Sequence, residues 1–393
     1  MSRRTTWTLT LALAVTLPAA SLACLWDYDT LEMERQDFPQ IAELISGKFL
    51  RHSKAFYEWR IKNRQARLEA TPNDVALYDD LAVAYDKTGQ HEKAIETILK
   101  VQEIKPDRYE TLANLGTFHI HNGDLETGLG FIEKAIEVNP EAHFGREIYQ
   151  KLLVKYVLEK RGDGPLPQPM SDEGTMYGRR GFARFVMLKL TGEVEGVDKG
   201  GEIEKAVKGV SGMMHFGHHD SPVLLEALAD LLMAKSGQEA RHLAARAWLK
   251  ASYETKNEDA SAAYRKFADQ VLSLQTPGRG THSRIPLLEF EQQFQQELAA
   301  AEEIFSDIVA NESRWIEEGA DVDRKFWQAY GVLPEEWADK QSSVKDQHFP
   351  STFGEWFWNT GRFWLPVVIL FAILIVWLRN TRRRRNTAEV PGE

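Results

Sequence analysis

Four residues able to bind a metal ion lie close together in the sequence: His215, His218, His219 and Asp220. Imidazole nitrogens and carboxylate oxygens are the donors that hold Zn²⁺ and similar ions. A structural role also fits, because Gly217 is a residue type that ends helices, and His and Asp in such connections commonly bond to backbone groups. We expect the structural role. A metal-dependent hydrolase or metal-handling protein that uses the three histidines is the alternative function.

The other chemically reactive side chains stand alone. His119 and His121 are two positions apart in a helical pattern, so their imidazoles face different sides and do not form a chelating pair. Cys24 is the only cysteine, which excludes a disulfide within the chain and a zinc site made of several thiolates. No phosphate-binding loop or zinc-protease motif is present. We therefore expect no catalytic residue, no cofactor and no enzymatic activity.

The charge balance argues against nucleic acid as a partner. The chain has 393 residues, with 48 Lys and Arg against 58 Asp and Glu, and a net charge of −10. A negatively charged protein gains little from contact with a phosphate backbone. The length is sufficient for two or three units that each bury a core.

Residues 1–23 have the order of a secretory signal. Arg3 and Arg4 precede an apolar stretch from Trp7 to Leu17, and small residues follow up to Ala23. The apolar stretch is shorter than the ~20 residues of a spanning helix, which disfavours the alternative of a short membrane anchor. We expect the body of the protein to be exported.

Cleavage after Ala23 would make Cys24 the first residue of the mature chain. A cysteine at this position is typical of lipid-modified bacterial proteins, although Ser21 occupies the place where leucine is usual. Cys24 is therefore a candidate lipidation site. An unmodified N-terminal cysteine is the alternative.

A second hydrophobic segment lies near the C-terminus. Residues 363–378 carry no charge and are long enough for about 24 Å of helix, and aromatic residues extend the segment to 353–378. Five arginines follow in 379–393, which marks this tail as cytoplasmic. We expect a single transmembrane helix, with a buried core helix as the alternative. The signal contributes +2 and the tail +3, which leaves −15 on the exported body.

Part of the chain repeats itself at an offset of 34 residues. The matched pairs are Tyr78 with Leu112, Leu81 with Leu115, Ala82 with Gly116, Gly89 with Gly123, Ile98 with Ile132, and Pro106 with Pro140. Apolar residues at steps of three and four predict helices, and the glycines predict turns between them. Segments 75–108 and 109–142 resemble tetratricopeptide repeats, with departures from the family pattern at His119 and Gly128.

The remaining segments also favour helices, so the expected fold class is all-α. A helical region at 24–161 contains the two repeats, and the Gly- and Pro-rich segment 162–182 is expected to be a linker. A second helical region at 183–352 includes a divergent repeat-like hairpin at 221–253. The amphipathic segment from Leu287 to Ile316 is expected to pack on the repeats, with self-association as a coiled coil as the alternative.

The resemblance implies a groove that binds a protein or peptide segment. The positions that line it in the family correspond here to Ala76, Asp79, Val83, Asp86, Lys87, Glu110, Ala113, Thr117, Ile120 and His121. Family members that clamp a C-terminal carboxylate have lysine and asparagine at positions that here hold other residues, so we expect no such clamp. The acidic residues favour a basic or mixed partner. The alternative is a groove filled by the chain's own segment, Cys24 to Phe38.

These observations together predict a membrane-anchored interaction scaffold of a bacterial-type cell envelope. The body would lie in the periplasm or outside the cell, and its partner would be another envelope protein. A scaffold for a larger membrane assembly, contacted through the span itself, is a further possibility.

Overall fold

The computed structural model describes residues 25–29, 39–140, 142–171, 179–194, 198, 200–235, 237–274 and 285–331. The predicted secretory signal, Cys24, the predicted membrane segment and the basic tail lie outside these residues. The described residues up to Tyr330 belong to one compact unit.

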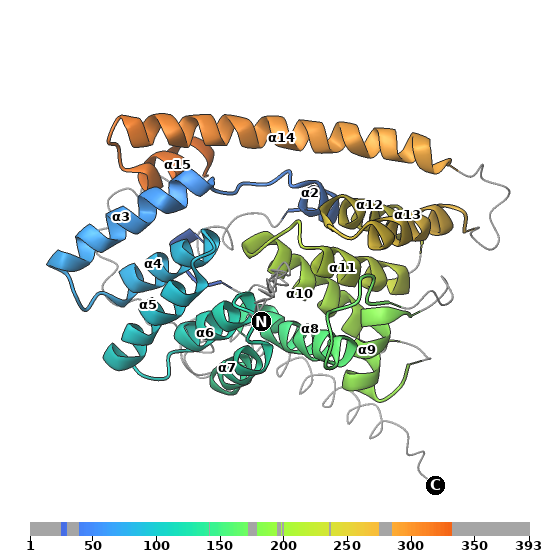
Figure 1. Ribbon diagram of the computed structural model, residues 1–393, viewed down its shortest axis with the longest axis horizontal. Coiled ribbons are helices and arrows are strands. Elements are labelled where there is room, and N and C mark those ends of the chain that lie inside the picture. Colours follow the sequence, from blue (N-terminus) through green and yellow to red (C-terminus); the bar gives the residue numbers. More distant parts are fainter. Residues whose placement is uncertain are drawn as a thin grey trace, which may run out of the picture. The chain divides into compact units, whose positions relative to one another are not determined.

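The described residues form helices and no strand, in agreement with the predicted all-α class (Figure 1). The helices are α2 (Ile41–Ser46), α3 (Lys54–Ala70), α4 (Val75–Lys87), α5 (His91–Ile104), α6 (Tyr109–His121), α7 (Leu125–Val138), the 3₁₀ turn η1 (Ala142–Gly145), α8 (Arg146–Arg161), α9 (Gly181–Thr191), α10 (Glu202–Phe216), α11 (Pro222–Lys235), α12 (Gln238–Glu254), α13 (Glu258–Leu272), α14 (Leu287–Glu317) and α15 (Val322–Tyr330). None of the helices in these ranges is both long and apolar enough to cross a membrane.

The two predicted repeats are two helical hairpins, α4 with α5 and α6 with α7. Asp74 begins the first hairpin because its side chain accepts a hydrogen bond from the backbone N–H of Ala76. Gly89 and Gly123 occupy the two turns with positive φ angles of 76° and 91°, which glycine adopts at little cost. The 34-residue offset seen in the sequence therefore corresponds to one hairpin.

Helices α6 and α7 approach each other most closely where two glycines face. A Cβ atom on Gly128 would lie 2.6 Å from the carbonyl oxygen of Gly116, and one on Gly116 would lie 2.5 Å from the side chain of Ile132. Alanine is usual in the family at the position of Gly128. The departure has a physical reason, because the backbones leave no room for a methyl group.

Replacing Gly128 with alanine is therefore expected to force α6 and α7 apart. Overpacking of this kind costs about 1–3 kcal/mol in the free energy of unfolding. The matched control is Gly130→Ala on the same helix, where nothing lies within 4 Å of the added atom. Gly130→Ala should raise the free energy of unfolding by about 0.5–1 kcal/mol, because alanine has a higher helix propensity than glycine. Denaturant unfolding of both purified variants measures the difference, and equal effects would contradict the close approach.

Helices α8 to α13 pack around the largest apolar core of the unit. The predicted hairpin at 221–253 is present as α11 and α12, which pack together, and α13 continues the array. The segment expected to be a linker is not wholly exposed, because Met170 and Ser171 are buried and their backbone N–H groups donate to Glu226 on α11. The two expected helical regions thus share one compact unit.

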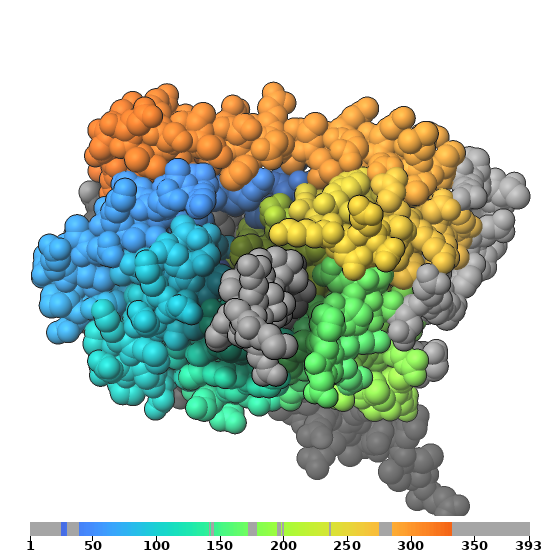
Figure 2. Space-filling view, in the orientation of Figure 1, coloured from blue at the N-terminus to red at the C-terminus, as the bar shows by residue number. Residues whose placement is uncertain are grey.

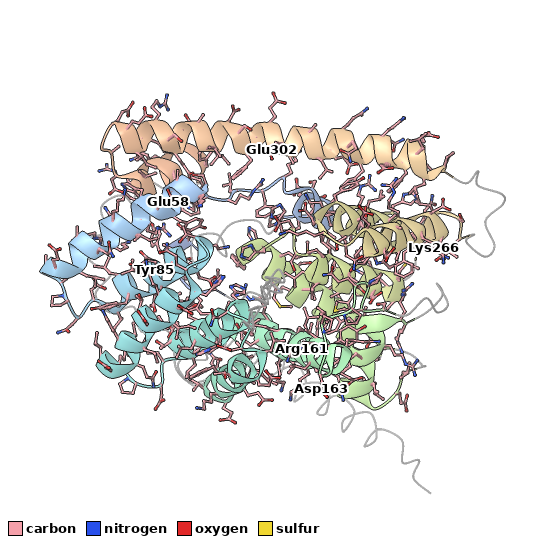
Figure 3. The ribbon with its side chains drawn as sticks, in the orientation of Figure 1. Glu58, Tyr85, Arg161, Asp163, Lys266 and Glu302 are labelled. Atoms are coloured by element: carbon pink, nitrogen blue, oxygen red, sulfur yellow. The ribbon has the colours of Figure 1, made fainter. Side chains whose placement is uncertain are left out.

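Helix α14 runs along one edge of the unit, from α13 and α2 to α3 and α15 (Figure 1). Its apolar face is buried at Phe290, Phe294, Ala301, Ile308 and Trp315. In the space-filling view its side chains meet those of α3 at one end and of α12 and α13 at the other (Figure 2). The exposed side carries charged residues such as Glu302 (Figure 3). The apolar face of this helix thus packs on the same chain, as expected.

Candidate functional site

The segment Leu25 to Asp29 lies inside the array of helices. Leu25 is 2% exposed and packs with Leu81, Val83 and Phe118. The backbone N–H of Trp26 donates to Asn114 over 2.8 Å, and the Asn114 amide donates back to the Trp26 carbonyl over 3.0 Å. The chain's own N-terminal residues therefore fill part of the expected groove, as the alternative prediction proposed.

A buried ionic network holds this segment in place. Arg60 is fully buried on α3 and its guanidinium lies 2.6 Å from both Asp29 and Asp323 and 3.3 Å from Asp27. Arg64, one turn further along α3, pairs with Asp323 over 2.7 Å and with Asp80 over 2.8 Å. Two arginines of one helix face thus connect the N-terminal segment with α4 and α15.

His52 completes the network on the other side of Asp29. Its Nε2 lies 3.2 Å from Asp29 and its Nδ1 lies 2.6 Å from Glu312 of α14, and the ring stacks on Phe56 with centroids 3.6 Å apart. Burial alone would lower the pKa of His52, but the two carboxylates raise it to about 9. His52 is consequently a buried cation at neutral pH.

This raised pKa predicts a pH-dependent stability. A histidine whose pKa is higher in the folded than in the unfolded protein stabilises fully below about pH 6.5, and the contribution is lost as the pH rises through about 9. The free energy of unfolding of the wild type should therefore fall between these values. In His52→Gln this slope should be reduced, whereas His119→Gln should keep it. Denaturant unfolding at a series of pH values makes the comparison, and parallel profiles for wild type and His52→Gln would refute a charged His52.

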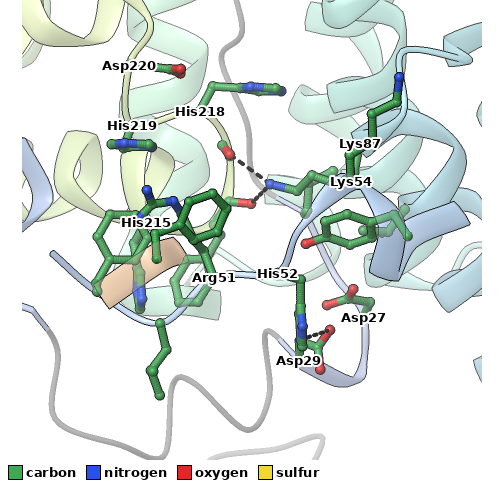
Figure 4. A pocket seen from close by; sticks show the side chains of 18 residues that line it. Asp27, Asp29, Arg51, His52, Lys54, Lys87, His215, His218, His219 and Asp220 are labelled. Carbon is green, nitrogen blue, oxygen red and sulfur yellow. Dashed lines mark hydrogen bonds and ion pairs between the residues drawn. The ribbon is translucent and has the colours of Figure 1, made fainter. Parts of the chain in front are cut away.

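A cavity of about 240 Å³ lies next to the network (Figure 4). Five parts of the chain line it. Two are the N-terminal segment and the residues around the start of α3. The others are the end of α4, the connection between α10 and α11, and Phe305 of α14. The lining residues with charged or imidazole side chains are Asp27, Asp29, Arg51, His52, Lys54, Lys87, His215, His218, His219 and Asp220. Both signs of charge therefore face this space.

The connection between α10 and α11 adds uncharged polar side chains to the lining. Burial and the Lys87 ammonium lower the pKa of His218 to about 3, and burial lowers that of His219 to about 4, so both imidazoles are neutral at pH 7. Lys87 itself donates to the carbonyl oxygens of Phe216 and Gly217 over 2.8 and 2.7 Å. This pair of hydrogen bonds ties the end of the first repeat to the end of α10.

At the mouth of the cavity, cations lie beside aromatic rings. The Arg51 guanidinium sits over the ring of Phe305 at 3.8 Å and donates to the carbonyl oxygen of Gly47. Phe49 makes edge-to-face contacts with His215 and His219. Lys54 is exposed. The mouth thus offers apolar surface and positive charge together.

The structure distributes the ten predicted groove residues over several roles. Val83 and Lys87 line the cavity, while Ala76 is exposed and Glu110 half-buried. The others are buried against the chain itself: Asp79 pairs with Arg108, Asp86 with His91 and His121, Thr117 accepts from Gln150, Ala113 packs near Trp26, and Ile120 lies in the large core. Counting Val83, seven of the ten side chains are buried in the chain itself, and the partner-binding role expected for the ten stays a prediction.

The histidine cluster predicted from the sequence, His215, His218 and His219, lines the cavity. A different group of residues brings its potential metal-binding atoms together. In the part of the chain that the structure describes, the group of metal-binding residue types that come within 4.8 Å of one another consists of Asp86, His91 and His121. The sequence predicts no chelating role for His121 together with His119. In the structure His121 lies instead beside Asp86 and His91.

Comparison with known families agrees with the hairpin geometry. Residues 75–108 match the family model described as tetratricopeptide repeat. The chain contains a tetratricopeptide repeat. The matched range is the α4–α5 hairpin, and α6–α7 repeats its geometry. Such repeats generally mediate protein or peptide binding and are typically non-catalytic. Among curated proteins, no sequence match to the chain is found.

Sequence reasoning missed most of the buried network around this repeat. Arg60 and Arg64 follow Phe56 at steps of four, which places two charges on a face that is otherwise suited to burial. A charge on such a face signals a buried partner. The partners Asp29 and Asp323 lie far away in the sequence, and no local pattern identifies them.

Proposed function

We propose that this protein is an interaction scaffold of the cell envelope. The body would be exported, held by the C-terminal hydrophobic segment 353–378, and would bind a segment of another envelope protein. The tetratricopeptide repeat at 75–108 supports the interaction role. Export and anchoring rest on the sequence of the two ends, and the partner is a protein or peptide rather than nucleic acid because the body is acidic.

The observation that carries the location of the binding site is the cavity lined in part by Val83 and Lys87 of the first repeat. Its volume of about 240 Å³ is smaller than the 300–1,000 Å³ of typical ligand pockets, which favours one or two side chains or a chain end over an extended peptide. Arg51, Lys54 and Asp220 at this site suit a segment of mixed charge. Phe49 and Phe305 supply apolar surface for an anchoring side chain.

Site-specific crosslinking in native membranes tests this function. A photoreactive residue in place of Lys54 at the mouth should give a reproducible crosslink to one protein. The matched control replaces Lys266, which is exposed on α13 away from the cavity lining (Figure 3). Arg51→Glu in the same background should abolish the crosslink. Equal labelling from both positions, or none from Lys54, would contradict a partner site at the cavity.

The proposed topology has a separate test. Protease added to the outside of intact cells, after removal of any outer membrane, should digest the body and leave a small fragment that contains the tail 379–393. Full protection of the body would place it in the cytoplasm and contradict the export proposal. This result does not depend on whether the cavity binds a partner.

A further inference from the structure

The ends of three helices bring two imidazoles to one buried carboxylate. Asp86 lies in the last turn of α4, His91 is the first residue of α5, and His121 is the last residue of α6. The turn at Gly89 reverses the chain, so that His91 returns to Asp86. His121 comes from the neighbouring repeat. Stacking of the two hairpins therefore assembles the cluster.

The distances within the cluster are short. The Nδ1 of His91 lies 2.8 Å from Asp86, and the Nδ1 of His121 lies 2.9 and 2.8 Å from its two oxygens. The Asp86 side chain is fully buried and that of His121 is 1% exposed. The side chain of His91 is 24% exposed, which leaves a route from solvent.

We propose that Asp86, His91 and His121 bind a divalent transition-metal ion such as Zn²⁺. The donor set of two imidazoles and one carboxylate is the type that Zn²⁺ takes in proteins. Donor atoms around a tetrahedral Zn²⁺ at about 2.0–2.1 Å stand about 3.3 Å apart. The two distances between imidazole nitrogens and Asp86 need to lengthen by only about 0.5 Å to accept the ion. The donor atoms of all three residues lie within 4.8 Å of one another.

The other ring nitrogen of His121 does not compete for the ion. Its Nε2 is buried, has no hydrogen-bond partner, and is not the nitrogen that faces Asp86. When Nδ1 binds a metal ion, Nε2 carries the imidazole proton. The ring of His218 lies edge-on to His121 with centroids 5.6 Å apart, so a further imidazole is available beside the site.

The charges around the cluster are compatible with a cation. Asp86 supplies the negative charge, and its carboxylate oxygens face the Nδ1 atoms of both imidazoles. The adjacent Lys87 directs its ammonium to the carbonyl oxygens of Phe216 and Gly217. A bound ion would link α4, α5 and α6, and so would fix the first repeat to the second.

Metal titration of the full-length protein in detergent, after treatment with a chelator, tests the proposal. Calorimetry with Zn²⁺ should show one equivalent bound, and the ion should raise the unfolding midpoint. His91→Gln should weaken binding at least tenfold and remove the shift in midpoint. Because His91 is partly exposed and begins a helix, this variant should still fold. The matched control is His119→Gln, also on α6 but outside the cluster, which should bind like the wild type.

Two outcomes would overturn the proposal. In the first, the wild type binds no stoichiometric Zn²⁺ and shows no shift in midpoint, which would leave Asp86 as an acceptor of two structural hydrogen bonds. In the second, the ion is retained by His91→Gln and Asp86→Asn but lost on changing His218 and His219. That pattern would place the ion at the cavity histidines instead.

Discussion

Replacing Arg60 with methionine should lower the free energy of unfolding by about 3–5 kcal/mol. The change keeps much of the side-chain volume but removes the positive charge that lies within 2.6–3.3 Å of three carboxylates. Asp29 and Asp323 would remain buried with fewer partners, and uncompensated charge in the interior is costly. Denaturant unfolding of the purified protein measures the effect.

The control for this experiment is Arg67→Met on the same helix. Arg67 is exposed, so its removal should change stability by no more than about 0.5 kcal/mol. Adding Asp29→Asn to Arg60→Met should recover part of the loss, because it removes one of the stranded charges. If Arg60→Met and Arg67→Met were equally mild, the network would not be holding the N-terminal segment.

Truncating Leu25 to alanine is expected to cost about 2–5 kcal/mol. Leu25 is 2% exposed and fills a space between α4 and α6, where Leu81, Val83 and Phe118 surround it. Its loss would leave a cavity under a segment that also makes an apolar contact through Trp26, with the cluster around Tyr109 and Ala113. The segment should then detach more easily, and limited proteolysis near residues 25–29 should be faster.

Leu99→Ala provides the comparison for Leu25. Leu99 is 43% exposed on α5, and its truncation should cost less than about 0.5 kcal/mol. Proteolysis at the N-terminal segment should then proceed at the wild-type rate. Equal destabilisation by both changes, or no acceleration of cleavage in Leu25→Ala, would show that the segment does not contribute to the core.

The helical hairpins could be predicted because their information is local. Leu81, Ala82 and Ile98 fall on one face of each helix, and Gly89 marks the turn. The spacing therefore predicts both the helix and the face that it buries. The same holds for α11 and α12, whose ends agree with the predicted hairpin within a residue or two.

The candidate site could be predicted only in part, because it joins distant segments. The cavity unites Asp29, Lys87 and His218, which no periodic pattern relates. Lys87 lines the cavity, but the sequence could not show that its ammonium would donate to the end of α10. Burial of the groove by residues 25–29 was foreseeable as an alternative, since Leu25 and Trp26 are apolar residues that need a contact surface.

The proposed metal cluster of Asp86, His91 and His121 could be predicted less readily than the hairpins but more readily than the cavity. His91 is five residues after Asp86, across a turn that the sequence predicts. His121 follows Asp86 by 35 residues, one residue more than the 34-residue repeat. Stacked repeats place such positions side by side. Comparison of residues one repeat apart, instead of residues near each other in the sequence, would have brought them together.

The pairing of Asp29 with Arg60 and of Arg60 with Asp323 has a consequence for how the chain folds. The Trp327 indole also donates to Asp29, across 298 positions of sequence. During synthesis residues 25–29 emerge long before Trp327, and Arg60 emerges 263 positions before its partner Asp323. Contacts of such separation form late, because the intervening chain must first be ordered. Residues 25–29 should accordingly be among the last residues to adopt their native contacts. A chain arrested before α15 should form its hairpins, but Arg60 and Arg64 would lack Asp323, the carboxylate with which both pair.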